Sequence, residues 1–281
     1  MTMTETDRAS SRTAHISKWA YLKVIFALLS RDVAVLKKNL KFFVIRVIMQ
    51  PLLFVFVFTY VFPKIGQGVG GSGAKASEFS TLLVAGVVGI SIIFQAVQAV
   101  ALPLVQEFGY TREIEDRALA PMPIWGLALE KILSGAIQSL LAAIVVFPIV
   151  LLIPATPVHL HFDWPVLLTI VPLSAVLSGA LGLTIGTLIP PNQVPLIFAI
   201  IVLPITFLGA VYYPWAALTP IEWLKIAVLI NPLIYINEGL RAALTQGVPH
   251  MELGYVYLAL VAFTLVLLVV STKGLRRRIV S

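Results

Sequence analysis

The chain contains no cysteine and few charged residues. The lack of cysteine excludes disulfide frameworks, thiolate catalysis and cysteine-ligated metal sites. Charged residues make up only 12% of the 281 residues, whereas a soluble domain is typically about a quarter charged. A phosphate-binding loop of the G-x-x-x-x-G-K-[ST] kind is also absent, so the sequence contains no nucleotide site of that type.

Hydrophobic residues dominate the sequence and fall into long runs. They make up 59% of the chain, and a helix needs about 20 consecutive apolar residues to cross the core of a bilayer. We therefore predict an all-α integral membrane protein with six transmembrane helices, at about residues 43–62, 81–105, 132–153, 166–189, 194–212 and 253–272.

The domain organisation follows from these spans. Residues 1–17 are polar and lack the apolar stretch and cleavage site of a signal peptide, so we expect a disordered cytoplasmic leader. Residues 18–272 are predicted to form a single transmembrane domain, and residues 273–281 a basic cytoplasmic tail.

The distribution of charge predicts the orientation in the membrane. The chain has 20 Lys and Arg residues against 13 Asp and Glu, and the basic residues gather near both ends of the sequence. The loop 154–165, between the third and fourth spans, has no Lys or Arg. Because cytoplasmic loops are enriched in Lys and Arg, both termini are predicted to be cytoplasmic. Basic ends on such an apolar chain favour contact with anionic headgroups over binding to nucleic acid.

Residues 18–42 are predicted to form an amphipathic helix at the membrane interface. Apolar residues recur at spacings of three or four and share one face, whereas basic residues lie on the other. The apolar face is Leu22, Phe26, Leu29, Val33, Leu36 and Leu40. The alternative is a solvated connector.

A charged segment, residues 106–123, lies between the second and third spans. Its charged side chains are Glu107, Arg112, Glu113, Glu115, Asp116 and Arg117. A short charged helix on the cytoplasmic face could transmit force from a partner protein. Equally, the segment could be a solvated loop whose ion pairs contribute little. Just beyond it, Glu130 and Lys131 are expected to be interfacial anchors of the third span.

Residues 213–250 contain an apolar piece that is too short to cross a bilayer. Asn231-Pro232 interrupts it, so we expect two short helices that dip into the outer leaflet, where protein or water must cover the backbone. Glu238 and Arg241 are three residues apart and are predicted to pair on one helix face. The pair either holds this hairpin together or gates an exit.

Polar and small residues inside the spans indicate where helices meet. Gln95, Gln98 and Gln138 are costly in lipid, so they either line a translocation path or bond neighbouring helices. A repeat of Ser178, Gly182 and Gly186 predicts a face for close helix packing. In the outer loop, residues 159, 161 and 163 form an H-x-H-x-D cluster; zinc sites usually have three or four convergent ligands, and we predict no metal site.

Two stretches resemble a known family. The run TREIEDRALAPMPIWGLALEKIL is similar to the cytoplasmic loop and following helix of type-2 ATP-binding-cassette (ABC) permeases, which export drugs, lipids and polysaccharides from bacteria. The run GAVYYPWAALTPIEWLKIAVLINPLIYINEGLRAAL resembles the second hallmark of that family. The resemblance covers the whole chain in length and span order, and within the family it points to the daunorubicin-type drug and lipid exporters.

The resemblance implies roles for these segments. Residues 106–123 would be the coupling element that docks on a separate nucleotide-binding ATPase, although Ile-Glu-Asp-Arg stands where many members have a Gly-Thr-rich stretch. The outer re-entrant gate would contain Tyr213, Pro214, Asn231, Pro232, Glu238 and Arg241. The chain itself would be no enzyme and would carry no cofactor. It would pair with a second permease, identical or paralogous, in a bacterial plasma membrane.

Two other classes also have many spans. A membrane enzyme acting on lipid usually clusters Asp, Glu or His at cytoplasmic span ends, but the acidic cluster here alternates with arginine. A secondary transporter predicts an internal repeat and ionisable residues at mid-span, and the sequence has no such repeat and almost no charge there. Both patterns favour the exporter permease.

Overall fold

A computed structural model describes residues 18–66, 74–108, 123–190, 193 and 198–280. All regular secondary structure in these ranges is helical, in agreement with the predicted fold class. In chain order the helices are α2 (Lys18–Lys38), α3 (Leu40–Val55), the π-helix η1 (Phe56–Val61), α4 (Phe62–Lys64), α5 (Ala74–Gln106), α7 (Ile124–Leu152), α8 (Trp164–Leu188), the π-helix η4 (Phe198–Val202), α10 (Leu203–Phe207), the 3-10 helix η5 (Trp215–Leu218), α11 (Glu222–Ala227), the 3-10 helix η6 (Val228–Ile230), α12 (Pro232–Leu244) and α13 (Leu253–Val280).

Five helices in the described part of the chain are long and apolar enough to cross a membrane, judged by length and composition. They are α3 with its continuation through η1 and α4, and α5, α7, α8 and α13. They coincide with five of the predicted spans. Several extend beyond the apolar run: α5 begins at Ala74 and α13 continues to Val280, so the basic residues 273–280 belong to a helix.

The span predicted at residues 194–212 is described only in part. Residues 194–197 lie outside the described ranges. The remainder consists of η4 and α10, which are followed by a turn that contains Ala210. Ala210 has a positive φ of 54°, a conformation that few residues other than glycine adopt.

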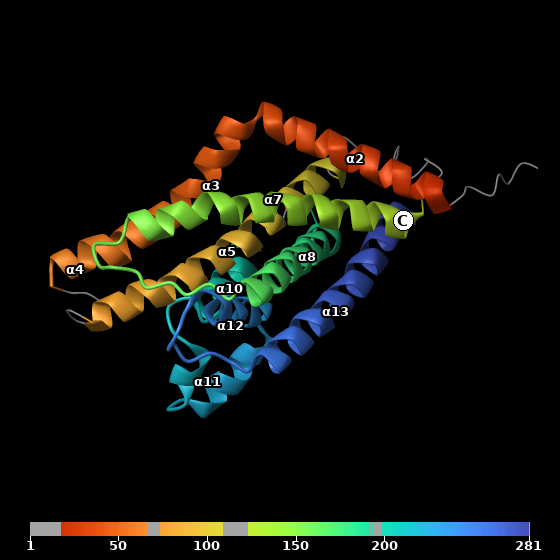
Figure 1. Cartoon of the computed structure of the whole chain (residues 1–281). Helices are drawn as coiled ribbons and strands as arrows, with labels where there is room; N and C mark the ends of the chain where they lie inside the picture. Colours follow the sequence, from red (N-terminus) through yellow and green to blue (C-terminus); the bar gives the residue numbers. More distant parts are fainter. Residues whose placement is uncertain (1–17, 67–73, 109–122, 191–192, 194–197, 281) are drawn as a thin grey trace, which may run out of the picture.

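The bundle is built around α5, which is largely buried and packs against α7 and α8 (Figure 1). Glycines allow the close approach that the small-residue repeat predicted. A Cβ atom on Gly182 would lie 3.0 Å from the carbonyl oxygen of Ala96 in α5. One on Gly179 would lie 2.5 Å from the carbonyl oxygen of Ile132 in α7. Helix α8 therefore meets both neighbours backbone to backbone.

Helix α2 covers one end of the bundle, the end that also holds the C-terminus of α13 (Figure 1). It packs against α7, with Ile25 buried and Leu29 half-buried. Trp19 and Phe26 instead expose about three quarters of their surface, at 75% and 74%. Exposed apolar side chains on a basic helix are typical of the membrane interface, which supports the predicted amphipathic helix.

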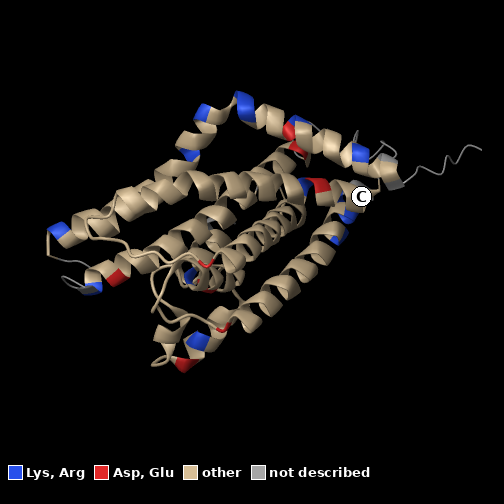
Figure 2. Ribbon diagram, viewed as in Figure 1, with Lys and Arg blue, Asp and Glu red and all other residues tan. Residues whose placement is uncertain are grey.

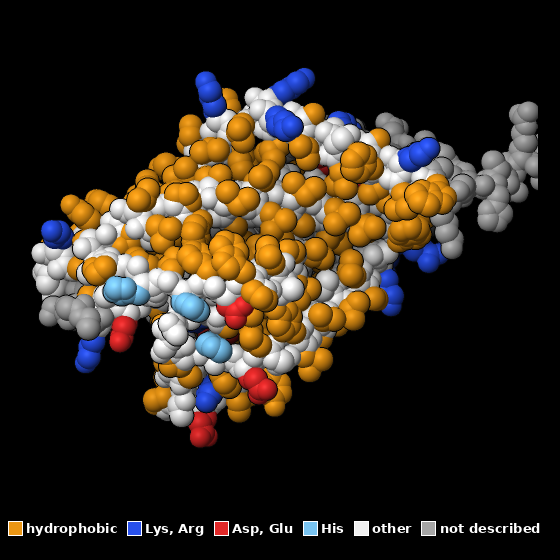
Figure 3. Space-filling model, in the orientation of Figure 1, with side chains coloured by type: hydrophobic (Ala, Val, Ile, Leu, Met, Phe, Trp, Pro, Cys, Tyr) orange, Lys and Arg blue, Asp and Glu red, His pale blue; other side chains and the backbone are white. Residues whose placement is uncertain are grey.

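The outer surface of the bundle is apolar. Hydrophobic side chains cover the middle of the face in Figure 3, whereas basic residues lie toward its margins. In α3 and α13 the large exposed side chains include Ile45, Leu53, Leu258 and Leu265. Contiguous apolar surface of this kind requires cover by lipid or protein, as expected of a multi-pass membrane protein.

Helix α12 lies at the centre of the other half of the molecule. It packs against α5, α8 and α13, and every residue but Ala242 is buried. The short elements η5, α11 and η6 precede it and lie at the periphery (Figure 1). The short helices predicted within 213–250 are therefore present as η5, α11 and η6 at the periphery, followed by the buried helix α12.

Candidate functional site

The start of α12 is fixed by the Asn-Pro pair noted in the sequence. The side chain of Asn231 accepts a hydrogen bond from the N–H of Leu233 at 3.0 Å, which makes it the helix N-cap. Pro232 follows at the first helical position, where its missing N–H costs nothing. The amide of Asn231 also donates to the carbonyl of Ile205 at 2.7 Å. This cap therefore ties α12 to α10.

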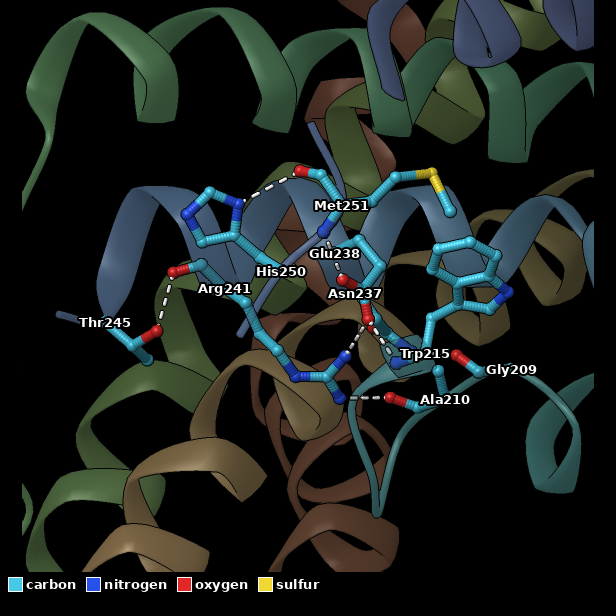
Figure 4. Close-up of polar contacts among 9 residues, drawn as sticks. All are labelled: Gly209, Ala210, Trp215, Asn237, Glu238, Arg241, Thr245, His250 and Met251. Atoms are coloured by element: carbon cyan, nitrogen blue, oxygen red, sulfur yellow. Dashed lines mark hydrogen bonds and ion pairs between the residues drawn. The ribbon is translucent and has the colours of Figure 1, made fainter. Parts of the chain in front are cut away.

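Glu238 and Arg241 form the ion pair that their spacing predicted. Arg241 Nη1 lies 2.6 Å from Glu238 Oε1, and both side chains are completely buried. The carboxylate also accepts two backbone hydrogen bonds, from the N–H of Trp215 to Oε1 at 2.8 Å and from the N–H of Met251 to Oε2 at 2.7 Å (Figure 4). A buried charge is stable only when it is paired and hydrogen-bonded, and Glu238 meets both conditions.

The same helix holds the turn that follows α10. Arg241 Nη2 donates to the carbonyl of Ala210, the residue with positive φ. The amide of Asn237 donates to the carbonyl of the preceding residue, Gly209, at 2.6 Å (Figure 4). We call Asn231, Asn237, Glu238 and Arg241 the α12 network. The network forms hydrogen bonds with backbone groups that precede η5, that begin η5 and that follow α12. It therefore joins η5, α11 and η6 to α12 as one unit.

The two remaining residues of the predicted gate lie beside the network. Pro214 immediately precedes Trp215, whose N–H binds Glu238. The hydroxyl of Tyr213 instead donates to the carbonyl of Phe207 at 3.3 Å. The structure thus brings five of the six predicted gate residues to the network or its border, and directs the Tyr213 hydroxyl toward the end of α10.

A second polar cluster lies where α2 meets the bundle. Lys131 Nζ in α7 is 2.7 Å from Glu107 Oε1, in the residue after α5, and both side chains are largely buried. Glu130 is fully buried. The expected interfacial anchors are thus directed into the protein. The Glu107–Lys131 pair connects the two spans that flank residues 109–122, which contain the predicted coupling residues Arg112, Glu113, Glu115, Asp116 and Arg117 and lie outside the described residues.

Asp32 attaches α2 to this cluster. Ser134 in α7 donates to Asp32 Oδ2 at 2.8 Å, and Arg31 lies 3.2 Å from Oδ1. Burial raises the pKa of Asp32, but hydrogen bonds to Ser134, Arg31 and Glu130 and the charge of Lys131 together hold it below its ordinary value. The ionised carboxylate therefore stabilises the attachment at neutral pH, and this contribution is lost only as the pH falls through the lowered pKa.

The three intramembrane glutamines lie near one another. Gln95 Nε2 in α5 is 3.4 Å from Gln138 Oε1 in α7, which is the geometry of a weak bond between helices. Gln95 and Gln98 both line a small chamber beside α3, together with Arg46. Gln138 lines a larger cavity next to it.

The H-x-H-x-D loop contributes to the packing of α8. The Asp163 carboxylate accepts a hydrogen bond from the N–H of Val166 at 3.2 Å and so caps that helix. The backbone N–H groups of His161 and Asp163 donate to carbonyls at the end of α12. These contacts join the start of α8 to the end of α12.

The sequence analysis missed three polar residues, Asp32, Ser134 and Asn237. It also missed that Lys131 pairs with Glu107. The Glu107–Lys131 pair could have been predicted, because the two opposite charges lie at neighbouring ends of two consecutive spans. For Asn237 the partner is a backbone carbonyl 28 positions away, and no residue type marks such a group in a sequence.

Comparison with known proteins agrees with this architecture. A model of the ABC-2 type transporter family matches residues 23–245, from the interfacial helix to the end of the α12 network. The inner membrane transport permease YadH of Escherichia coli strain K12 is 28% identical over 242 residues, which cover 83% of this chain and 90% of that protein. The proteins of the same name from Escherichia coli O157:H7 and Shigella flexneri match equally well.

The family model matches well over half of the chain, and the relatives match along nearly their whole length. The all-helical fold and the five long apolar helices agree with a permease that crosses the membrane several times. The chain therefore belongs to the ABC-2 type transporter family, and it is a membrane transport permease subunit.

Proposed function

We propose that the chain is the membrane-spanning subunit of an ABC exporter. It moves a hydrophobic or amphiphilic substrate, such as a drug, a lipid or a lipid-linked glycan, out of the cytoplasm or the inner leaflet. The match to the ABC-2 type family over residues 23–245 is the observation that carries this proposal. The absence of a phosphate-binding loop from the sequence supports ATP hydrolysis on a separate nucleotide-binding subunit.

The proposed setting is a bacterial inner membrane, with both termini in the cytoplasm. The basic side chains on α2 and at the end of α13 lie toward one end of the bundle (Figure 2), which supports this orientation. The permease works as a dimer with a second copy or with a paralogue. The exposed apolar surfaces of α3 and α13 leave room for such a partner as well as for lipid.

Coupling to the ATPase is assigned to residues 106–123. The segment connects α5 to α7, and the buried Glu107–Lys131 pair joins these two helices at its base. A partner that moves the segment would therefore move both spans together, as in rigid-body transitions between packed elements.

The exit gate is assigned to the unit held by the α12 network. Gln95, Gln98 and Gln138 are assigned to the path, because two of them line a chamber and the third a cavity within the bundle. The buried network supports a gate that moves as one piece, since opening any one contact of Glu238 would leave a buried charge with fewer partners.

The decisive experiment reconstitutes the permease with and without its ATPase. We expect the purified chain alone to hydrolyse no ATP. Together with the nucleotide-binding subunit it should form a stable complex that expels a fluorescent lipid or hydrophobic dye from the inner face of proteoliposomes when ATP is supplied.

The matched control is the same complex with an ATPase subunit that binds but does not hydrolyse ATP. It should assemble normally and transport nothing. ATP hydrolysis by the permease alone, or equal transport by the control complex, would contradict the proposal.

A further inference from the structure

A cavity of about 630 Å³ lies beneath the interfacial helix. Its walls come from α2, α3, α5 and α7, and it is not enclosed. Neither the α12 network nor the H-x-H-x-D loop contributes to it. The cavity is of the size that binds small molecules and cofactors in proteins.

Five charged residues line the cavity, three cations and two carboxylates: Arg31, Arg46, Lys131, Asp32 and Glu107. The formal charges of these five side chains add up to +1, from three cations and two carboxylates. Glu130 is fully buried and does not line the cavity.

Arg46 is the cation that carries this excess. Lys131 is paired with Glu107 at 2.7 Å and Arg31 with Asp32 at 3.2 Å. Within the described part of the chain no carboxylate lies within ion-pair distance of Arg46. A guanidinium is well suited to bind a phosphate through two parallel hydrogen bonds.

The rest of the wall is apolar. Val35, Leu36, Phe42 and Phe43 contribute to it from α2 and α3, and Phe42 is also exposed on the outer surface. A site lined both by cations and by aromatic and aliphatic groups fits a molecule that is charged at one end and apolar at the other. Its position at the interfacial helix is the depth at which lipid headgroups lie.

The adjoining chamber is too small for a headgroup to pass. It shares Arg46 with the cavity, and its volume of about 30 Å³ has room for one or two water molecules. An occupant of the large cavity is thus held at the interface, where it borders Gln138 but does not reach Gln95 and Gln98.

We propose that this cavity is a binding site for the phosphate headgroup of an anionic phospholipid from the leaflet in which α2 lies. Arg46 binds the phosphate, Arg31 supports it at the open edge, and the acyl chains lie along Phe42 and the exposed face of α3. The bound lipid fastens α2 and α3 to α5 and α7. The inference concerns a resident lipid and stands apart from the transported substrate.

Lipid binding by the purified full-length chain tests this site without ATPase or transport. The protein is delipidated in detergent and titrated with phosphatidylglycerol, with phosphatidylcholine or with inorganic phosphate. Native mass spectrometry measures the bound lipid, and thermal unfolding measures the stabilisation. We expect phosphatidylglycerol to bind and to raise the midpoint more than phosphatidylcholine, and inorganic phosphate to have little effect.

Two variants of α3 identify the residue responsible. Arg46→Gln should weaken phosphatidylglycerol binding about fivefold, the effect of removing one cation near an anionic headgroup. Lys41→Gln removes an equally exposed cation of the same helix that does not line the cavity, and should change binding little. Arg31→Gln, on α2, provides a second test, with an effect in the same direction.

Three results would overturn the proposal. The first is equal phosphatidylglycerol binding by the Arg46 and Lys41 variants. The second is equal binding of phosphatidylcholine and phosphatidylglycerol by the unmodified chain. The third is full stabilisation by inorganic phosphate, which would indicate a site for a free anion. Loss of transport would leave these measurements unchanged, so failure of the export function and failure of this site are distinguishable.

Discussion

At the scale of single residues, the α12 network shows how one buried charge is stabilised. Glu238 receives one charged and two backbone donors, and none of these donors belongs to an adjacent residue. Such a site is sensitive to loss of either partner, because the one that remains is buried without its counter-charge. Replacing both charges removes that penalty.

We predict that Glu238→Gln lowers the free energy of unfolding by about 3–5 kcal/mol, because it leaves the Arg241 guanidinium buried and unpaired. The double variant Glu238→Gln with Arg241→Gln should be more stable than the sum of the single effects indicates. Thermal or denaturant unfolding in detergent measures both. Glu222→Gln, an exposed carboxylate of α11, is the control, and an equal loss in the control would contradict the prediction.

Gly89 in α5 packs closely against Asn237 of the α12 network. A Cβ atom there would lie 2.0 Å from Asn237 Oδ1, whereas one on Gly254 in α13 would meet only Glu252 Oε1, at 3.9 Å. We expect Gly89→Ala to destabilise the protein by about 1–3 kcal/mol through overpacking. Gly254→Ala should have no such cost in the same unfolding assay. Similar midpoints for the two variants would rule out the contact.

At the scale of helices, hydropathy predicted five of the spans because it reports the thickness of the hydrocarbon layer. It did not predict the helix ends beyond that layer. Helix α5 includes the polar residues around Lys75, and α7 begins eight residues before the predicted span at 132. Intrahelical hydrogen bonds continue past the membrane surface, where apolar residues are no longer needed.

The elements between α10 and α12 were predicted only as short helices. Their arrangement depends on Asn231, Asn237 and Arg241 donating to backbone carbonyls of residues 205, 209 and 210. Each contact spans more than 25 positions of sequence. A sequence identifies the polar side chain but not the distant carbonyl, so the Glu238–Arg241 pair was predictable from its spacing and the rest of the network was not.

The coupling segment is also tested at this scale. Glu113 and Arg117 are spaced i, i+4 and would share a face of a helix. We predict that Glu113→Lys and Arg117→Glu reduce both recovery of the ATPase with the permease and transport, because they place like charges against the partner. Membrane abundance should be unchanged, since surface substitutions usually cost less than about half a kcal/mol.

The control is Glu222→Lys, a charge reversal on the exposed α11. It should leave recovery of the ATPase as in the unmodified permease. Normal transport and full ATPase recovery in both segment variants would remove residues 106–123 from the mechanism.

At the scale of the whole molecule, basic residues are concentrated toward one end of the bundle. Basic residues gather on α2 and at the end of α13, whereas the loop after α7 lies at the opposite end (Figures 1 and 2). We predict that reporters fused at Ser281 and inserted at His161 report opposite sides of the membrane, with Ser281 in the cytoplasm. Both reporters on the same side would contradict the six-span topology.

The central position of α12 bears on how the protein is made. The ribosome synthesises α3, α5, α7 and α8 first, and α12 begins only at residue 232 of 281. Until then the surfaces of α5 and α8 that α12 will cover have no protein neighbour. The nascent chain thus depends on lipid or on the insertion machinery to shield its future core. The bundle is incomplete until α12 and α13 have been synthesised, so a ribosome that stalls before them leaves an unfinished bundle in the membrane.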